Sequence, residues 1–104
     1  MAPVTSRNGL VTVEATAQGL PLRISVDAEE LRRDPDELAR EILRLCRKSA
    51  QRAGAELRAE LASAGVANDM LALSGLPTHE EAVRQELIDE QEYDMEPQSW
   101  LRGL

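Results

Sequence analysis

The sequence is poor in aromatic residues and contains one cysteine. Only 2% of its 104 residues are aromatic, namely Tyr93 and Trp100, and phenylalanine is absent. Proteins that bind single strands or RNA stack bases on several aromatic side chains, so this class is nearly excluded. A lone Cys46 cannot form an internal disulfide, which excludes a secreted scaffold held together by disulfides.

Long apolar runs are also absent. No stretch approaches the ~20 apolar residues that a membrane-spanning helix needs, and residues 1–7 lack the charged start and apolar stretch of a signal peptide. We therefore expect a cytoplasmic protein with no membrane contact. The length allows one domain core, and 42% hydrophobic residues are enough to form it.

The net charge of −7 is concentrated in the last part of the sequence. Residues 1–62 contain ten basic and ten acidic residues, whereas residues 63–104 contain nine acidic residues against Arg84 and Arg102. An acidic segment repels phosphate backbones, so the net charge disfavours nucleic acid as a partner. The alternative is a solvated tail that only keeps the protein soluble. The charge pattern divides the chain into a unit of residues 1–62 and an acidic extension of residues 63–104.

Two glycine turns divide the first part of the chain into short strands. Asn8-Gly9 and Gln18-Gly19 are typical of hairpin turns. Residues 10–16 between them alternate between apolar and polar side chains and are rich in β-branched residues. Apolar residues then recur with a period of two at Leu20, Leu22, Ile24 and Val26. With a short edge strand at residues 4–6, this pattern predicts a two- or three-stranded antiparallel meander over residues 3–26.

A long helix is predicted after the meander. Asp34 is a good N-cap, Pro35 suits the first helical position, and Glu37 completes a capping box. The helix is expected to run to about Ala62, with Gly54 as its weak point. Apolar residues at steps of four and three form the face expected to cover the sheet: Leu38, Ile42 and Leu45.

A second apolar stripe on this helix has the 3-4-3-4 spacing of paired helices. We call it the helix seam, and it consists of Leu43, Cys46, Ala50, Ala53 and Leu57. Its small side chains allow close approach, so we predict a homodimer, or a heterodimer with a related chain. The alternative is that the seam packs on the C-terminal segment of its own chain.

Basic residues gather on the helix side opposite the apolar stripe. We call them the basic row, and they are Arg40, Arg44, Arg47, Lys48, Arg52 and Arg58. Doubled in a dimer, the row could follow a DNA duplex through phosphate contacts. The alternative is an ordinary solvated face, partly neutralised by Glu41.

The extension contains a second helix start. Thr78 caps it and Glu81 stands at the reciprocal position of a capping box. We expect a short helix over about residues 78–92 with a narrow apolar stripe, and a loop or frayed helix end over residues 63–75. The stripe is formed by Ala82, Val83 and Leu87.

Nothing in the sequence predicts catalysis or metal binding. His79 is the single histidine and Cys46 the single cysteine, too few for a zinc site. In the helix seam Cys46 should behave as a small hydrophobic residue. No serine stands in a nucleophile elbow, and the glycines belong to turns rather than to a phosphate loop. We therefore predict no enzyme activity and no cofactor.

Residues 4–62 resemble the YbaB/EbfC nucleoid-associated family. The resemblance lies in the turn and strand of residues 8–13, the turn at Gly19, the strand end at residues 24–27 and the long helix from Asp36. It implies an α+β fold, a meander followed by one long helix, that dimerises and binds DNA without strong sequence preference. The chain differs in lacking a long helix before the sheet and in adding the acidic extension.

Residues 75–82, followed by Glu86, Glu90 and Tyr93, are similar to the C-terminal part of the actinobacterial type VII secretion-associated proteins EspD and EspH. This second resemblance implies an accessory or chaperone-like protein for secretion partners. The main functional prediction is therefore a non-enzymatic helper that binds a secretion-associated protein. The extension residues expected to contact that partner are Leu76, Val83, Leu87, Tyr93 and Trp100. The alternative is a DNA-binding protein that uses the basic row, with the acidic extension as an internal competitor.

Overall fold

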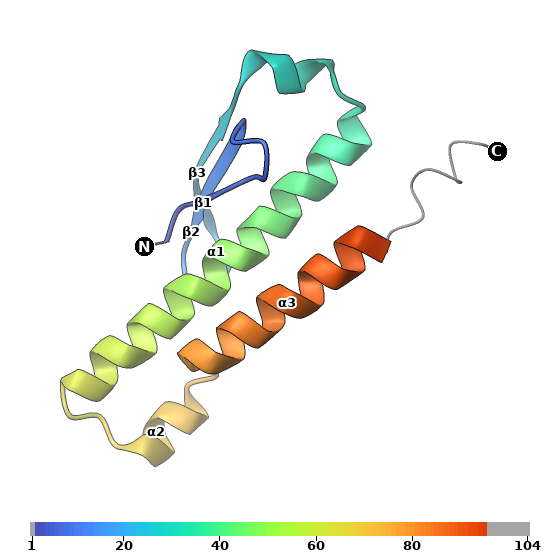
Figure 1. The fold of residues 1–104 in the computed structure, drawn as a ribbon. Helices are drawn as coiled ribbons and strands as arrows, with labels where there is room; N and C mark the ends of the chain where they lie inside the picture. Colours follow the sequence, from blue (N-terminus) through green and yellow to red (C-terminus); the bar gives the residue numbers. More distant parts are fainter. Residues whose placement is uncertain (1, 96–104) are drawn as a thin grey trace.

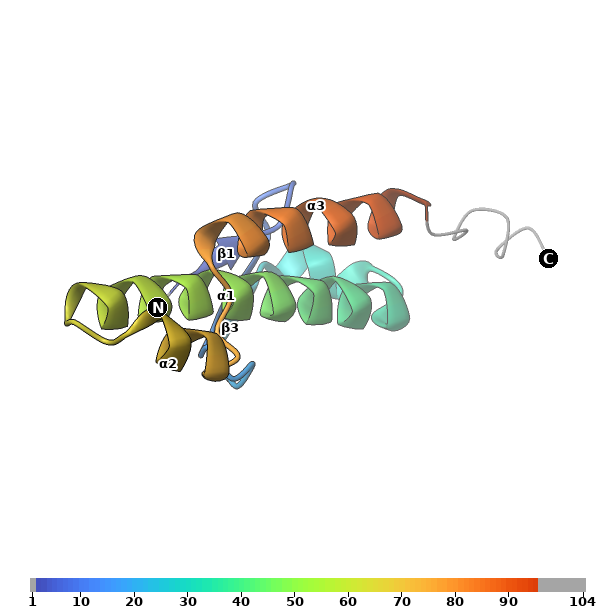
Figure 2. The ribbon, with the colours of Figure 1, turned by 90° about the horizontal axis from the view of Figure 1, so that it is seen from below.

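The structure is a computed structural model that describes the backbone of residues 2–95 and the side chains of residues 2–91. A three-stranded antiparallel sheet packs against one long helix, and a second helix lies antiparallel along the other side of that helix (Figures 1 and 2). The α+β architecture predicted from the sequence is confirmed.

The sheet follows the chain order β1, β2, β3. Its strands are β1 (Val4–Thr5), β2 (Val11–Ala15) and β3 (Pro21–Val26). Both predicted turns form at glycines with positive φ, 78° at Gly9 and 87° at Gly19, a conformation that other residues adopt at a cost. The meander is therefore the one that the sequence predicted.

Helix α1 (Pro35–Ser63) covers β1 and β2, and a short 3-10 helix, η1 (Ala28–Arg32), leads into it. Asp34 caps α1 by accepting a hydrogen bond from the Asp36 backbone N–H at 3.2 Å. The predicted face of α1 does cover the sheet. The core joins Val4, Val11, Val13 and Leu45, with Val26, Leu38, Ile42 and Cys46 packed around them.

Helix α1 covers strand β3 only in part. Ile24 pairs with the buried Val13 across the sheet and so points to the same face, yet it is 44% exposed, and Leu22 is 48% exposed. Figure 2 shows the reason, because α1 lies over β1 and β2 while β3 lies on the side of α1 away from α3 (His79–Met95). Apolar surface of the sheet is consequently left open along this edge.

The segment after α1 differs from the prediction. Residues 68–73, expected to be a loop, form the short helix α2 (Asn68–Leu73), which buries Leu71. Helix α3 begins at the predicted capping box: Thr78 Oγ1 accepts from the Glu81 N–H, and Glu81 Oε1 accepts from the Thr78 N–H, both at 3.1 Å. The same bond from the Thr78 N–H lowers the pKa of Glu81. None of the described helices is long and apolar enough to cross a membrane.

Candidate nucleic-acid interface

The basic row lies along α1 on sides that the sheet does not cover. Its six cations fall into three groups: one is buried, three are bonded to segments of the acidic extension, and two are exposed. The three groups differ in how accessible their cations are to a phosphate.

Arg44 is the buried member of the row. Only 8% of the residue is exposed, and its Nε and Nη2 atoms both donate to Glu41 Oε2, at 3.1 and 2.9 Å. Removing one partner of a buried ion pair leaves an uncompensated charge, which is costly. The pair with Glu41 lies within α1, and burial leaves Arg44 less accessible to a phosphate than the exposed members of the row.

Lys48 and Arg52 contact α3. Arg52 Nε donates to Glu86 Oε1 at 2.6 Å, and its Nη2 lies 3.4 Å from Glu86 Oε2. Lys48 Nζ donates to Glu90 Oε1 at 3.3 Å. The bond to Glu86 raises the pKa of Arg52 further. Two charges of the basic row are thus neutralised by carboxylates of the acidic extension.

Arg58 supports the chain that leads into α3. Its Nη1 donates to the Leu76 carbonyl oxygen at 2.8 Å. The neighbouring Pro77 lies directly over Gly54, where an added Cβ would be 2.8 Å from the proline Cδ. Gly54 was predicted to be only a weak point of the helix. The structure instead shows that its missing side chain makes room for this crossing.

Arg40 and Arg47 are the exposed members of the row. The Arg40 Nε donates a long hydrogen bond of 3.4 Å to the Asp36 carbonyl oxygen. Arg47 borders a shallow hollow formed with Gly19, Leu43 and Ala50. Because both residues are exposed, this part of α1 is open to a ligand in solution.

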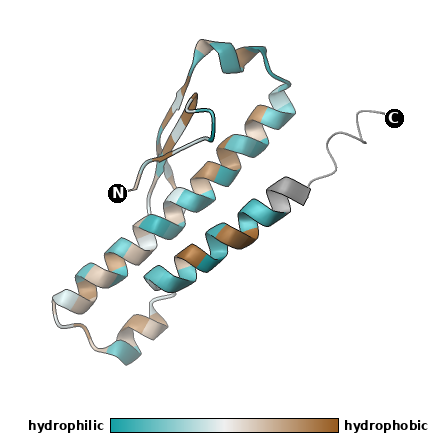
Figure 3. Ribbon diagram, in the orientation of Figure 1, coloured by the Kyte–Doolittle hydropathy of each residue, from teal (hydrophilic) through white to brown (hydrophobic). Residues whose placement is uncertain are grey.

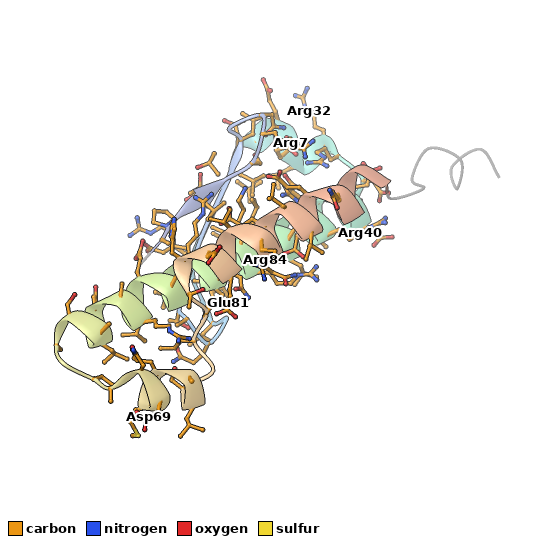
Figure 4. The ribbon with its side chains drawn as sticks, turned by 60° about the horizontal axis from the view of Figure 1, so that its bottom comes forward. Arg7, Arg32, Arg40, Asp69, Glu81 and Arg84 are labelled. Carbon is orange, nitrogen blue, oxygen red and sulfur yellow. The ribbon has the colours of Figure 1, made fainter. Side chains whose placement is uncertain are left out.

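Further exposed arginines lie outside α1, on elements that are distant from the basic row in the sequence. Arg7 and Arg32 lie at the end of the molecule where the β1–β2 turn meets η1 (Figure 4). Asn8 and Arg33 tie these two segments together through Glu30, at 2.7 Å each. Because these residues belong to separate segments, no sequence periodicity could have indicated that they lie together.

The helix seam is open at one end and partly covered at the other. Leu43 is 58% exposed, Cys46 and Ala50 are half-buried, and Ala53 is buried. Leu57 and Ala53 face the β2–β3 turn across a hollow that Thr16 and Gln18 also line. At about 100° per residue, the seam lies roughly half a turn away from Lys48 and Arg52. The seam therefore lies on a different side of α1 from the residues that contact α3.

The residues examined for catalysis lie apart. The Cys46 thiol sits beside the core, where burial raises its pKa, which disfavours the reactive thiolate. His79 lies at the start of α3, beside the groove between α3 and α1. Within the described residues no three potential ligands come together to hold a metal ion.

The fold and the basic row define a small α+β protein with a cationic helix. A family model described as the YbaB/EbfC DNA-binding family matches residues 2–68, which is more than half of the chain. The chain therefore belongs to the YbaB/EbfC DNA-binding family. No curated protein and no solved structure matches it.

This family membership corrects the main functional prediction. The matched part contains the sheet and the whole of α1, and the family is a DNA-binding one, so the prediction of a type VII secretion accessory or chaperone is wrong. The resemblance to EspD and EspH finds no support in the comparisons. Of the residues assigned to a secretion partner, Leu76 is half-buried and Val83 and Leu87 are exposed, while the side chain of Tyr93 and all of Trp100 lie outside the described residues.

Proposed function

We propose that this protein binds double-stranded DNA as a dimer, without catalysis and without strong sequence preference. The observation that carries the proposal is the family match over the complete sheet and α1 unit. The cations exposed on that unit supply the chemistry, because arginine contacts to phosphate position a protein on a duplex without reading its sequence. The two aromatic residues of the chain are too few for a surface that stacks unpaired bases.

Arg40 and Arg47 are the groups we assign to phosphate contacts. They are exposed, they lie on nearly the same side of α1, and they are about two helical turns apart. Arginine suits the role because its planar guanidinium can donate two parallel hydrogen bonds to one phosphate. A dimer would present this pair twice along the duplex.

The dimer is proposed to form through the open apolar edge of the molecule. The exposed apolar residues of β3 and of the turn before it lie, with the open end of the helix seam, on the side away from α3: Leu20, Leu22, Ile24, Leu43 and Ala50. An edge strand flanked by exposed apolar side chains is suited to pairing with another chain. We propose a second copy of this chain as the partner, related by two-fold symmetry so that the same patch serves both protomers.

The test is a binding titration with a duplex of about 20 base pairs, two turns of B-DNA. The variant R40A/R47A is compared with R23A/R84A, which removes the same charge from the outer face of the sheet and from α3. Each phosphate contact contributes about 0.9 to the slope of log K against log salt, so R40A/R47A should flatten the slope by about 1.8 per protomer.

Equal affinities and slopes for the two double variants would contradict the assignment of Arg40 and Arg47. The absence of a complex at about 50 mM salt, with both the unmodified chain and a chain whose α3 carboxylates are neutralised, would contradict DNA binding itself. Competition between unrelated duplex sequences at a fixed salt concentration tests the lack of sequence preference.

A further inference from the structure

Helix α3 places carboxylates where a DNA backbone would place phosphates. Glu86 and Glu90 are one helical turn apart on α3 and bind Arg52 and Lys48, which are one turn apart on α1. The pairing runs antiparallel, as the two helices do in Figure 1. Two negative groups thus face two members of the basic row in register.

Over residues 79–91, whose side chains the structure describes, little apolar packing holds α3 against α1. Ala82 is the buried hydrophobic residue of this part, whereas Val83, Leu87 and Ile88 remain 42%, 58% and 42% exposed. Figure 3 shows α3 as mainly hydrophilic with short hydrophobic segments. A hollow of about 460 Å³ remains between the helices beside Ala55 and Ala82. Along this described part of α3, contact with α1 therefore depends strongly on the two ion pairs.

These ion pairs are partly open to solvent. In each pair one side chain is partly exposed and the other is largely buried: Arg52 is 44% exposed against 17% for Glu86, and Glu90 is 38% exposed against 18% for Lys48. Ion pairs that reach the surface are screened by salt. Because one member of each pair is exposed, a polyanion can compete for the contact.

The connection into α3 is held more firmly than α3 itself. Arg58 binds the Leu76 carbonyl oxygen, and Pro77 fits against Gly54. Because this anchor lies before the start of α3, the helix can leave α1 while residues 76 and 77 stay in place. The family match ends at residue 68, so α3 is an addition to the matched DNA-binding unit.

We propose that α3 is an autoinhibitory segment that competes with DNA phosphates for Lys48 and Arg52. The proposal rests on the DNA-binding function proposed above and adds a regulation of the same surface. When α3 is docked, Arg40 and Arg47 remain exposed to a duplex. When α3 leaves, Lys48 and Arg52 join them and extend the phosphate-binding surface.

The experiment compares the full-length chain with its E86Q/E90Q variant. Glutamine keeps the size of the side chain and removes the charge that holds the two cations. Because two partly exposed ion pairs no longer compete, duplex affinity should rise about 2- to 30-fold. The salt slope should steepen by up to about 1.8 per protomer, since the variant contacts two phosphates that the unmodified chain reaches only when α3 has left.

The matched control is D69N/E80Q. It also removes two negative charges from residues 63–104, at exposed positions on α2 and α3 for which the described part of the chain shows no ion pair. A general effect of net charge would raise affinity equally in both variants. Circular dichroism of each variant verifies that the helices remain folded.

Equal affinity and salt slope for E86Q/E90Q and the control, while R40A/R47A still weakens binding, would overturn autoinhibition and leave DNA binding in place. If no variant binds the duplex, both proposals are overturned. Hydrogen exchange of the unmodified chain gives an independent readout. Saturating duplex should speed amide exchange throughout α3, and unchanged protection of α3 would overturn the proposal.

Discussion

At the scale of single residues, tertiary contacts changed the roles that the sequence suggested. No sequence pattern indicates a structural role for Ser49, yet its hydroxyl is fully buried and joins the sheet to the helix. It accepts a hydrogen bond from the Ala15 N–H at 2.8 Å and donates one to the Ala2 carbonyl oxygen at 2.6 Å. A serine inside a helix gives no local signal of such a role, because both partners lie far away along the chain.

Replacing Ser49 with alanine should lower the free energy of unfolding by about 2 kcal/mol, because it leaves a buried N–H and a buried carbonyl without their partner. Urea denaturation monitored by circular dichroism measures the loss. Ser25, which is exposed on β3, provides the control: S25A should change the same quantity by less than about 0.5 kcal/mol. Equal effects for the two variants would show that the Ser49 bonds contribute nothing specific.

At the scale of elements, strong local signals gave the right helices and strands. Asp34 and the Thr78–Glu81 capping box start α1 and α3 as predicted, and the turns at Gly9 and Gly19 define the strands. Helix α2 was missed because its six residues have no side-chain cap and expose most of their apolar groups. Helix α2 is stabilised by tertiary packing, because its Leu71 is buried.

The crossing of Pro77 over Gly54 gives a prediction about α1 and the segment before α3. In an open helix, alanine is more stable than glycine by about 1 kcal/mol. Here G54A should instead destabilise the protein by up to about 2 kcal/mol, because overpacking at the proline ring costs about 1–3 kcal/mol.

The double variant G54A/P77A separates this contact from helix propensity. Without the ring Cδ the added methyl group has room, so the two substitutions should be non-additive by about 1 kcal/mol in thermal unfolding. Additive effects would mean that the chain adjusts around the added methyl group without strain, and that the close approach is not a constraint.

At the scale of the whole molecule, α1 is the central element with a different partner on each side. The sheet packs on one side and α3 lies on a second (Figure 2). The open end of the helix seam borders a shallow hollow beside Gly19 of the β2–β3 turn. The proposed acidic regulation and the proposed dimer contact thus use opposite sides of one helix. The two can act independently for this reason.

The dimer prediction is tested with L43E. Leu43 is already 58% exposed, so the fold should tolerate the change, whereas a charge buried without a partner at an interface should weaken dimerisation by about 100-fold or more. Sedimentation equilibrium measures the association. The control L73E alters an equally apolar exposed residue on α2 and should leave association unchanged. A wild-type chain that is monomeric at tens of micromolar, or a dimer that requires a different related chain, would contradict the homodimer.

The sequence by itself determined the local elements, because caps, glycine turns and apolar periodicity act over a few neighbouring residues. The tertiary structure alone decided which cations remain exposed to a ligand. Arg52 and Glu86 are 34 residues apart, so no local pattern could reveal that they pair. Charge neutralisation and burial depend on which elements are packed together in space. This packing buries Arg44 and pairs Lys48 and Arg52 with carboxylates of α3. It also leaves apolar side chains of β3 exposed.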